Sequence, residues 1–121
     1  MTTFDSQRMA LRPTLDLPSA TKVEEQFQNN TLRPIMKQQN DLLQAALEIF
    51  LVKRKVKLEQ VPTNQRFAKI KELVTRDNQL RGLLIGMAAG QFTSEEMVYY
   101  VSNERDVNRR MTNLLVERLC K

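Results

Sequence analysis

The stretch Arg81-Gly-Leu-Leu-Ile-Gly-Met-Ala-Ala-Gly-Gln-Phe92 contains all three glycines of this 121-residue chain, each four residues from the next. Residues four apart lie on one face of a helix, so the glycines form a bare strip beside apolar side chains. Arg81 is the only charged residue of the stretch. Because a helix that is apolar on every side is a buried one, we predict that residues 77–89 form the central helix of the fold.

Two of the three glycines predict close packing against another element. Gly90 fits just past the end of the helix, as its C-terminal cap. Gly82 and Gly86 remain on the helix, on the side opposite Leu80 and Leu84. The absence of two side chains lets another backbone approach closely, and the favoured interpretation is an internal crossing with a helix of the same chain. The alternative is a contact surface for a partner, across a dimer axis.

Apolar residues recur at helical spacing before this stretch as well. Pro34 suits a first helical turn, and Asn29-Asn30-Thr31 separates it from a short helix that begins near residue 19. The alternative is one long helix kinked at Pro34. The residues expected to face inward are Ile35, Leu42, Leu43, Ala46, Ile49 and Phe50 in a helix over 34–57, and Phe67, Ile70, Leu73 and Val74 in a helix over 63–76.

Two more helices are expected after the glycine strip. Thr93-Ser-Glu-Glu96 is a capping box, which predicts a helix that begins at Ser94. Ser102 and Asn103 are expected to end this helix before a last one over 104–119. The last helix carries Val107, Met111, Leu114, Leu115 and Leu119 on one side.

Length and composition predict a single all-α domain. The chain is 41% hydrophobic and 27% charged and has only three glycines and four prolines, which is typical of a helix-rich globular protein. Residues 1–18 include Pro13 and Pro18 and show no sustained period, so they predict an extended N-terminal arm. Residues 19–121 are then expected to form one helical domain, a bundle of five or six helices.

Residue counts exclude several kinds of chemistry. The chain has no histidine and one cysteine, Cys120, so it lacks an intrachain disulfide, a His/Cys zinc site and histidine-based catalysis. No reacting constellation is visible, and we expect no cofactor or metal. The first residues lack a basic region followed by an apolar run, and no apolar run reaches the ~20 residues of a membrane span. The protein is therefore expected in the cytoplasm, without a membrane partner.

Polar residues on the apolar stripe of residues 34–57 suggest a pocket between helices. Gln39 falls near the centre of that stripe and Asn40 at its edge. A buried amide must find hydrogen-bond partners or it destabilises the fold. The favoured alternative is a satisfied network without a ligand. The candidate pocket residues are Arg33, Gln39, Asn40, Asp77 and Arg81.

Positive charge gathers in residues 53–76, which hold eight basic and two acidic side chains. A nucleic-acid-binding face has this pattern, and so has an ordinary solvated face. Residues 93–115 loosely follow a helix-turn-helix, although Glu104 and Asp106 would repel phosphates there. The residues that could contact nucleic acid are Lys53, Arg54, Lys55, Lys57, Arg66, Lys69, Arg109 and Arg110.

Three stretches resemble a family of similar-sized bacterial proteins. They are Phe27-Gln-Asn-x-Thr-Leu-Arg-Pro-Ile-x-Lys-x-Gln-Asn-Asp-Leu-Leu43, Gly86-x-x-x-Gly-Gln-Phe-Thr-x-Glu-Glu96 and Asn108-Arg-Arg-Met-x-Asn113. The family is a small all-helical Bacteroidetes family of unknown function, and the resemblance covers about residues 27–119. It implies no established activity, cofactor or site. Related proteins sometimes bear a glyoxalase label, which the absence of histidine argues against.

These observations favour a non-enzymatic protein that works through protein–protein contacts, with itself or with another protein. The doubly apolar helix, the glycine strip and six methionines in an aromatic-poor chain support a homodimer. Nucleic-acid binding is the second hypothesis. A small-molecule binder or enzyme at the polar cluster is the third.

Overall fold

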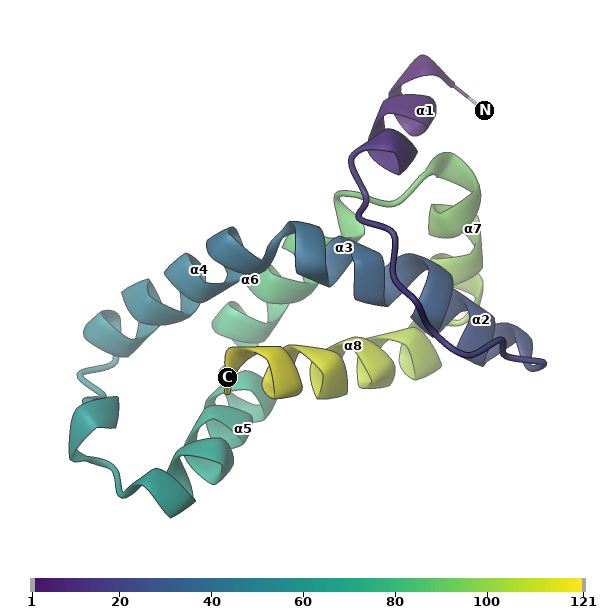
Figure 1. Ribbon diagram of the computed structural model, residues 1–121. Coiled ribbons are helices and arrows are strands. Elements are labelled where there is room, and N and C mark those ends of the chain that lie inside the picture. Colours follow the sequence, from purple (N-terminus) through teal and green to yellow (C-terminus); the bar gives the residue numbers. More distant parts are fainter. Residues whose placement is uncertain (1, 121) are drawn as a thin grey trace.

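The computed structural model describes residues 2–120, of which no residue forms a strand, and 77% of the chain is helical (Figure 1). The all-α prediction is confirmed, but the expected count of five or six helices is too low. A π-helical turn, η1 (Gln28–Leu32), and two 3₁₀ turns, η2 (Leu58–Gln60) and η3 (Thr63–Gln65), lie between the α-helices. The α-helices are α1 (Thr3–Ala10), α2 (Val23–Phe27), α3 (Arg33–Gln38), α4 (Asn40–Lys53), α5 (Arg66–Arg76), α6 (Asn78–Ala89), α7 (Ser94–Ser102) and α8 (Glu104–Leu119).

Helix α8 lies at the centre of the packing, where the sequence predicted the helix over 77–89. It contacts α4, α5, α6, α7 and η1. Its inward side is buried through Val107, Met111, Leu114, Leu115, Val116 and Leu119. The predicted inward side of this helix is thus confirmed, and the assignment of the central helix is corrected.

Helix α6 is buried on one side only. Leu80, Leu84 and Ala88 pack toward the core, whereas Gly82 and Gly86 are exposed. Glycine is uncharged and fits an apolar pattern, yet it has no side chain whose burial would stabilise the fold. A helix with a single charged residue can therefore leave its glycine side in water at little hydrophobic cost.

The chain runs through α2, η1 and α3 as one continuous helical path. The expected interruption at residues 29–31 is a widened π turn, not a break. Pro34 follows this turn, and its ring would clash with the carbonyl of Asn30 in a regular helix. The backbone at this position is a widened π turn and not a regular α-helix, so the geometry that produces the clash is absent. The path breaks at Gln39 (φ −91°, ψ 6°) instead, which divides the expected 34–57 helix into α3 and α4.

Three residues expected to face inward lie at the surface. Leu42 is 59% exposed, Ile49 65% and Phe67 51%. The buried side of α4 is formed by Leu43, Ala46, Leu47 and Phe50. Leu42 and Ile49 are seven residues apart and therefore lie on the same side of α4, beside the buried side. The single apolar stripe predicted from the sequence thus corresponds to one buried and one exposed apolar edge in the structure.

The boundaries around α6 and α7 agree with the sequence. The Asp77 side chain accepts a hydrogen bond from the Leu80 N–H and caps α6. Thr93 and Glu96 form the reciprocal capping box, so α7 begins at Ser94 as predicted. Gly90 follows the last residue of α6, as expected of a cap, but its φ of −62° is right-handed.

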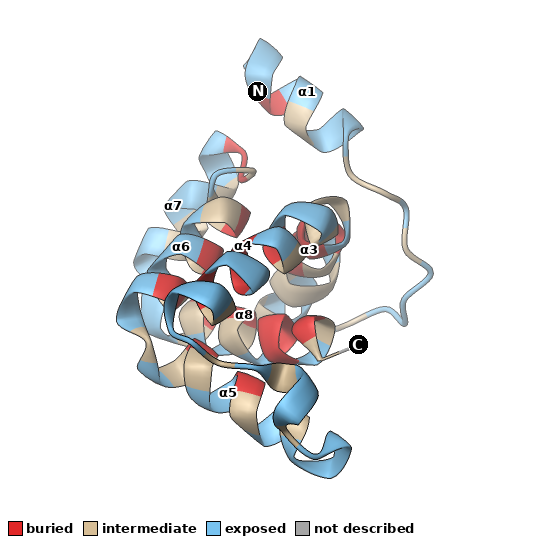
Figure 2. Ribbon diagram, turned by 90° about the vertical axis from the view of Figure 1, so that its left-hand side faces the viewer, coloured by how far each residue is buried: buried red, intermediate tan, exposed pale blue. Residues whose placement is uncertain are grey.

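The N-terminal arm is not extended over its whole length. Residues 3–10 form α1, which Thr2 caps through its side chain, and the irregular segment follows. Figure 2 shows α1 at the edge of the body with little buried surface, and Asp5 is its buried residue. A helix without an inward apolar stripe leaves no periodic pattern in the sequence.

None of the described helices is both long enough and apolar enough to cross a membrane.

Candidate interaction surface

An open apolar surface runs along α6 and α7. We call it the α6–α7 face and define it by Gly82, Leu83, Gly86, Gly90, Met97, Val98 and Val101. Its side chains are well exposed, with Leu83 at 44%, Val98 at 68% and Val101 at 65%. Exposed apolar residues that gather in one place mark interaction sites more often than scattered ones do.

Open space lies over Gly82 and Gly86 of α6. A Cβ atom added at Gly82 or at Gly86 would meet no atom within 4 Å among the described residues. The helices that pack on α6 are α4, α5 and α8, and they meet it on the side of Leu80 and Leu84. The favoured prediction of an internal helix crossing is therefore wrong.

The glycine strip leads into a groove of about 600 Å³. Met97, Val98 and Val101 of α7 form one wall, and Ala89 and Gly90 form the end of α6 beside it. Arg8 of α1 also lines the groove, so the N-terminal arm contributes part of its rim. The groove begins at the end of the strip, because Gly90, four residues after Gly86, lines it.

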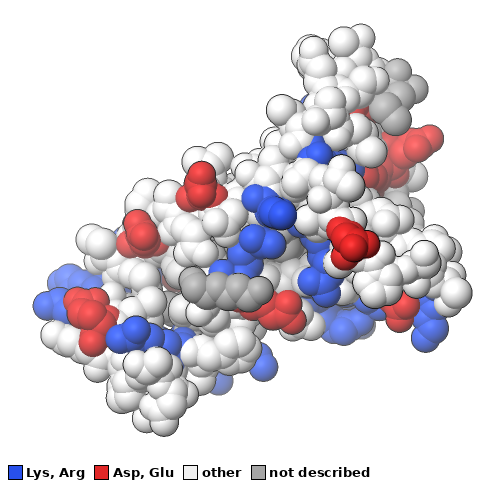
Figure 3. Space-filling model, viewed as in Figure 1, with Lys and Arg blue, Asp and Glu red and all other residues white. Residues whose placement is uncertain are grey.

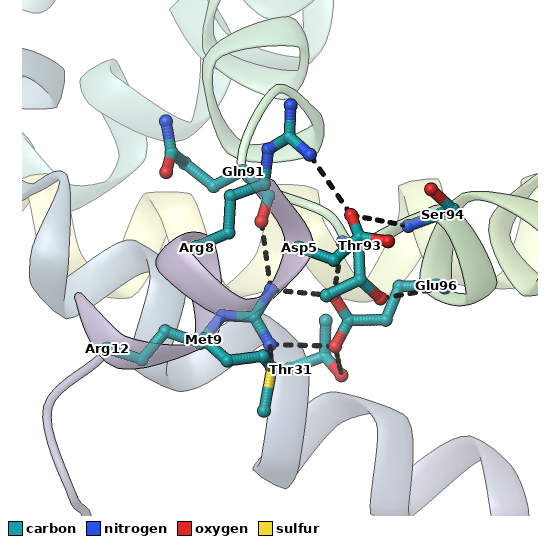
Figure 4. A network of polar contacts seen from close by, with 9 residues as sticks. All are labelled: Asp5, Arg8, Met9, Arg12, Thr31, Gln91, Thr93, Ser94 and Glu96. Atoms are coloured by element: carbon teal, nitrogen blue, oxygen red, sulfur yellow. Dashed lines mark hydrogen bonds and ion pairs between the residues drawn. The ribbon is translucent and has the colours of Figure 1, made fainter. Parts of the chain in front are cut away.

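A polar network fixes the arm beside this groove (Figure 4). Both terminal nitrogens of Arg12 bind the Glu96 carboxylate, at 2.7 and 2.6 Å, and Nη2 also donates to the Gln91 carbonyl at 2.9 Å. The side chains of Arg12 and Glu96 are only 5% and 15% exposed. A two-pronged ion pair of this kind is among the stronger polar contacts in proteins.

Glu96 joins three segments of the chain. One carboxylate oxygen accepts from the Thr93 N–H and the other from the Thr31 hydroxyl, both at 2.8 Å. Burial opposes ionisation, but hydrogen bonds from Arg12, Thr93 and Thr31 outweigh it and hold the pKa of Glu96 below its ordinary value. One carboxylate thus connects the arm, η1 and the start of α7.

Asp5 makes the second contact between α1 and α7. Its carboxylate accepts from the Ser94 N–H at 3.1 Å and from Arg8 at 3.0 Å. Burial raises the pKa of Asp5, but hydrogen bonds from Ser94 and Thr2 lower it by more, so the pKa lies below its ordinary value. A carboxylate at the first residue of a helix is also favoured by the helix dipole. The arm is therefore attached by polar contacts.

The sequence revealed only two of the five side chains that hold this network together. Thr93 and Glu96 were visible as a capping box, whereas Arg12, Asp5 and Thr31 were not. Arg12 is 84 residues from Glu96, and Asp5 is 89 residues from Ser94. No local pattern predicts pairs at such separations.

The predicted polar pocket does not exist as one site. Arg33 donates to Asn29, and Arg118 to Asn40 at 3.5 Å, near a cavity of only about 50 Å³. Asp77 instead binds Arg54 at the other end of α4, about 20 Å away by helix length. Hydrogen bonds from Arg54 and from the Leu80 N–H lower the pKa of Asp77 to about 2.

The remaining pocket candidates are separate as well. Gln39 forms the break between α3 and α4, and its side chain makes no hydrogen bond among the described residues. Arg81 donates to the Thr75 carbonyl and the Asn78 side chain. Arg81 lines a different cleft from the one expected.

Four of the eight basic residues of the 53–76 segment are engaged within the chain. Lys53 and Arg54 lie 5.3 and 5.4 Å from the ring of Phe50, and both donate to Gln79. Arg66 donates to a backbone carbonyl, and Lys69 pairs with Glu72 at 4.0 Å. Lys55 and Lys57 make no such contact within residues 2–120. Figure 3 shows blue and red atoms side by side at this end of the molecule, not one basic patch.

The helix-turn-helix candidates are also paired. Arg109 and Arg110 both bind Asp106, at 2.8 and 3.0 Å, and Arg110 donates to Gln28 as well. A single residue, Asn103, separates α7 from α8. A DNA-binding helix-turn-helix needs a turn of about three or four residues, so the geometry departs from that motif.

Comparisons with known proteins give this chain no family. No protein family, curated protein or solved structure that was compared matches it. The resemblance to the Bacteroidetes family stays a prediction. In the described part of the chain, no three acidic or cysteine side chains gather closely enough to hold a metal ion.

Proposed function

We propose that this protein works through protein–protein contact at the α6–α7 face, and that the partner is a second copy of the chain. The observation that supports this most is the open space over Gly82 and Gly86. Each exposed glycine in a helix costs about 0.5–1 kcal/mol relative to alanine. A strip without side chains compensates this cost where another backbone packs closely against it.

The exposed area supports a partner of ordinary size. The chain exposes 7818 Å², whereas a compact monomer of this mass exposes about 6,700 Å². The excess of about 1,100 Å² exceeds the roughly 800 Å² that each partner buries in a standard interface. Leu83, Val98 and Val101 are part of the exposed apolar surface of the chain.

The shape of the face favours a second copy over an unrelated partner. In a two-fold symmetric dimer the same surface of both copies forms the contact, so that surface must carry both the protruding side chains and the depressions that receive them. Leu83 projects beside Gly86, three residues further along the same helix. Two antiparallel α6 helices can therefore each place Leu83 on the bare strip of the other.

A concentration series in analytical ultracentrifugation tests the proposal. Wild type is expected to dimerise, and Gly86→Leu to remain monomeric with a melting temperature no lower than that of the wild-type monomer. Ala68→Leu, at an exposed position of α5, adds a leucine away from the face and should still dimerise. A wild-type chain that stays monomeric at high concentration, or a Gly86→Leu variant that dimerises normally, would overturn the proposal.

Nucleic-acid binding remains the second hypothesis, with Lys55 and Lys57 as its uncommitted cations. It predicts salt-dependent binding to duplex DNA or RNA at low ionic strength. We place the protein in the cytoplasm because Cys120, its single cysteine, fits a reducing compartment. Burial raises the pKa of the Cys120 thiol, which keeps it protonated.

A further inference from the structure

A polar cleft of about 360 Å³ lies where the end of α5 meets α6 and α8. It shares no lining residue with the α6–α7 face. No acidic side chain of the described residues lines it. The lining residues that matter to the argument are Thr75, Arg81, Ile85, Asn108, Arg109 and Asn113.

Arg81 supplies a positive charge that no carboxylate neutralises. Its Nη1 donates to the Thr75 carbonyl at 3.0 Å, and its Nη2 to the Asn78 side chain at 2.9 Å. No acidic side chain within residues 2–120 pairs with it. The nearby Asp77 is bound to Arg54 instead. These two contacts orient the guanidinium and leave three of its five N–H donors for a ligand.

Asn108 supplies neutral donors to the same cleft. The Tyr100 hydroxyl donates to its Oδ1 atom at 2.7 Å, which fixes the amide group. The two N–H donors of Nδ2 make no hydrogen bond among the described residues. At the rim, Arg109 is 62% exposed and already paired with Asp106, so it adds long-range attraction more than contact.

We infer that this cleft binds a small organic anion through a carboxylate or phosphate group, held by Arg81 and the Asn108 amide. The planar guanidinium matches both oxyanions, because each can accept two parallel N–H bonds. The volume is near the lower end of the range for small-molecule pockets, and it exceeds the space that a bare ion needs. Ile85 provides an apolar wall for the rest of the ligand.

Calorimetric titration with inorganic phosphate, glycerol 3-phosphate and malonate, at constant ionic strength, tests this inference. Wild type is expected to bind one or more of these probes saturably. Arg81→Gln and Asn108→Asp are each expected to weaken binding by about tenfold or more. Arg105→Gln removes the same charge from an exposed position of α8 outside the cleft and should bind as wild type does.

The two variants separate a lost site from a lost fold. Arg81→Gln removes contacts to the end of α5, whereas Asn108→Asp keeps an acceptor for Tyr100 and adds a repulsive charge. A variant with normal melting but weakened binding supports the site, and a preference for glycerol 3-phosphate or malonate assigns the anion class. No saturable binding up to about 10 mM would overturn the inference, as would equal binding by Asn108→Asp and Arg105→Gln.

Discussion

Helices α8 and α6 contradict the simplest expectation about which helix is buried. The α8 sequence, Glu-Arg-Asp-Val-Asn-Arg-Arg-Met-Thr-Asn-Leu-Leu-Val-Glu-Arg-Leu, is dense in charge, yet α8 forms the centre of the core. The α6 sequence has one charged residue, yet half of its surface is open. Burial follows the direction in which large apolar side chains point, and not the average polarity of a helix. α8 carries its buried apolar side chains on its inward side, whereas the open side of α6 carries Gly82 and Gly86 beside the exposed Leu83.

The prediction with the largest expected effect compares one leucine from each helix. Leu115→Ala in α8 is expected to lower the free energy of unfolding by about 2–5 kcal/mol, because Leu115 is fully buried. Leu83→Ala in α6 should change it by about 0.5 kcal/mol or less in the monomer, since Leu83 is 44% exposed. Urea denaturation of both variants at low protein concentration measures the two values. Equal losses would mean that α6 is as buried as α8.

The N-terminal arm extends the comparison, because Arg12 and Asp5 attach it to the body through polar contacts. Arg12→Ala is expected to cost about 1–3 kcal/mol locally, since it leaves the half-buried Glu96 without its main partner. The buried Nε of Arg12 has no hydrogen-bond partner among residues 2–120, which reduces this value. Amide hydrogen exchange should show lost protection in α1 and little change in α8.

Arg109→Ala is the matched control for this prediction. Its ion pair with Asp106 is exposed, at 62% and 36% for the two side chains. Exposed pairs contribute about 0–1 kcal/mol, so exchange in α1 should not change. If Arg12→Ala instead lowered protection uniformly across the chain, the arm would be part of the core and not an appended element.

Acid should release the arm before it unfolds the body. The pKa values of Glu96 and Asp5 lie below 4.5 and 3.8 in the folded chain, so their stabilisation is complete above those values. It declines as the pH falls through the lowered pKa values, because protonation removes the acceptors for Arg12 and Ser94. Exchange protection of α1 between pH 6 and pH 3 measures the effect. Glu96→Gln should remove much of the pH dependence, and protection of α1 that increased in acid would contradict it.

The sequence predicted local features of the fold well. The start of the helix near residue 77, the Thr93–Glu96 capping box and the break at Ser102–Asn103 were all located correctly, because each depends on groups within a few residues of one another. The inward side of α8 was correct for the same reason. α1 was missed because it lacks an apolar stripe, and the break at Gln39 because no glycine or proline marks it.

The candidate site was harder to predict, since it depends on contacts between distant segments. Gly82 and Gly86 were identified as a packing strip, but their surroundings could not be read from a pattern that is the same for a buried and an open helix. The polar pocket failed because Arg33 and Asp77 lie near opposite ends of α4. Spacing along a sequence shows which side of a helix a residue occupies, and not which helix comes to meet it.

The smallest expected effect distinguishes a glycine that the backbone conformation requires from one that allows close packing. None of the described glycines has a positive φ, so the backbone of α6 does not require them. Gly86→Ala is therefore expected to stabilise the monomer by about 0.5–1 kcal/mol, since a Cβ there meets nothing within 4 Å. Gly90→Ala is the control, because its Cβ would lie 3.2 Å from the Gly86 carbonyl oxygen and should gain less. If Gly86→Ala also weakens dimerisation, the glycine is retained for close approach of a partner; a destabilised monomer would show that α6 is covered after all.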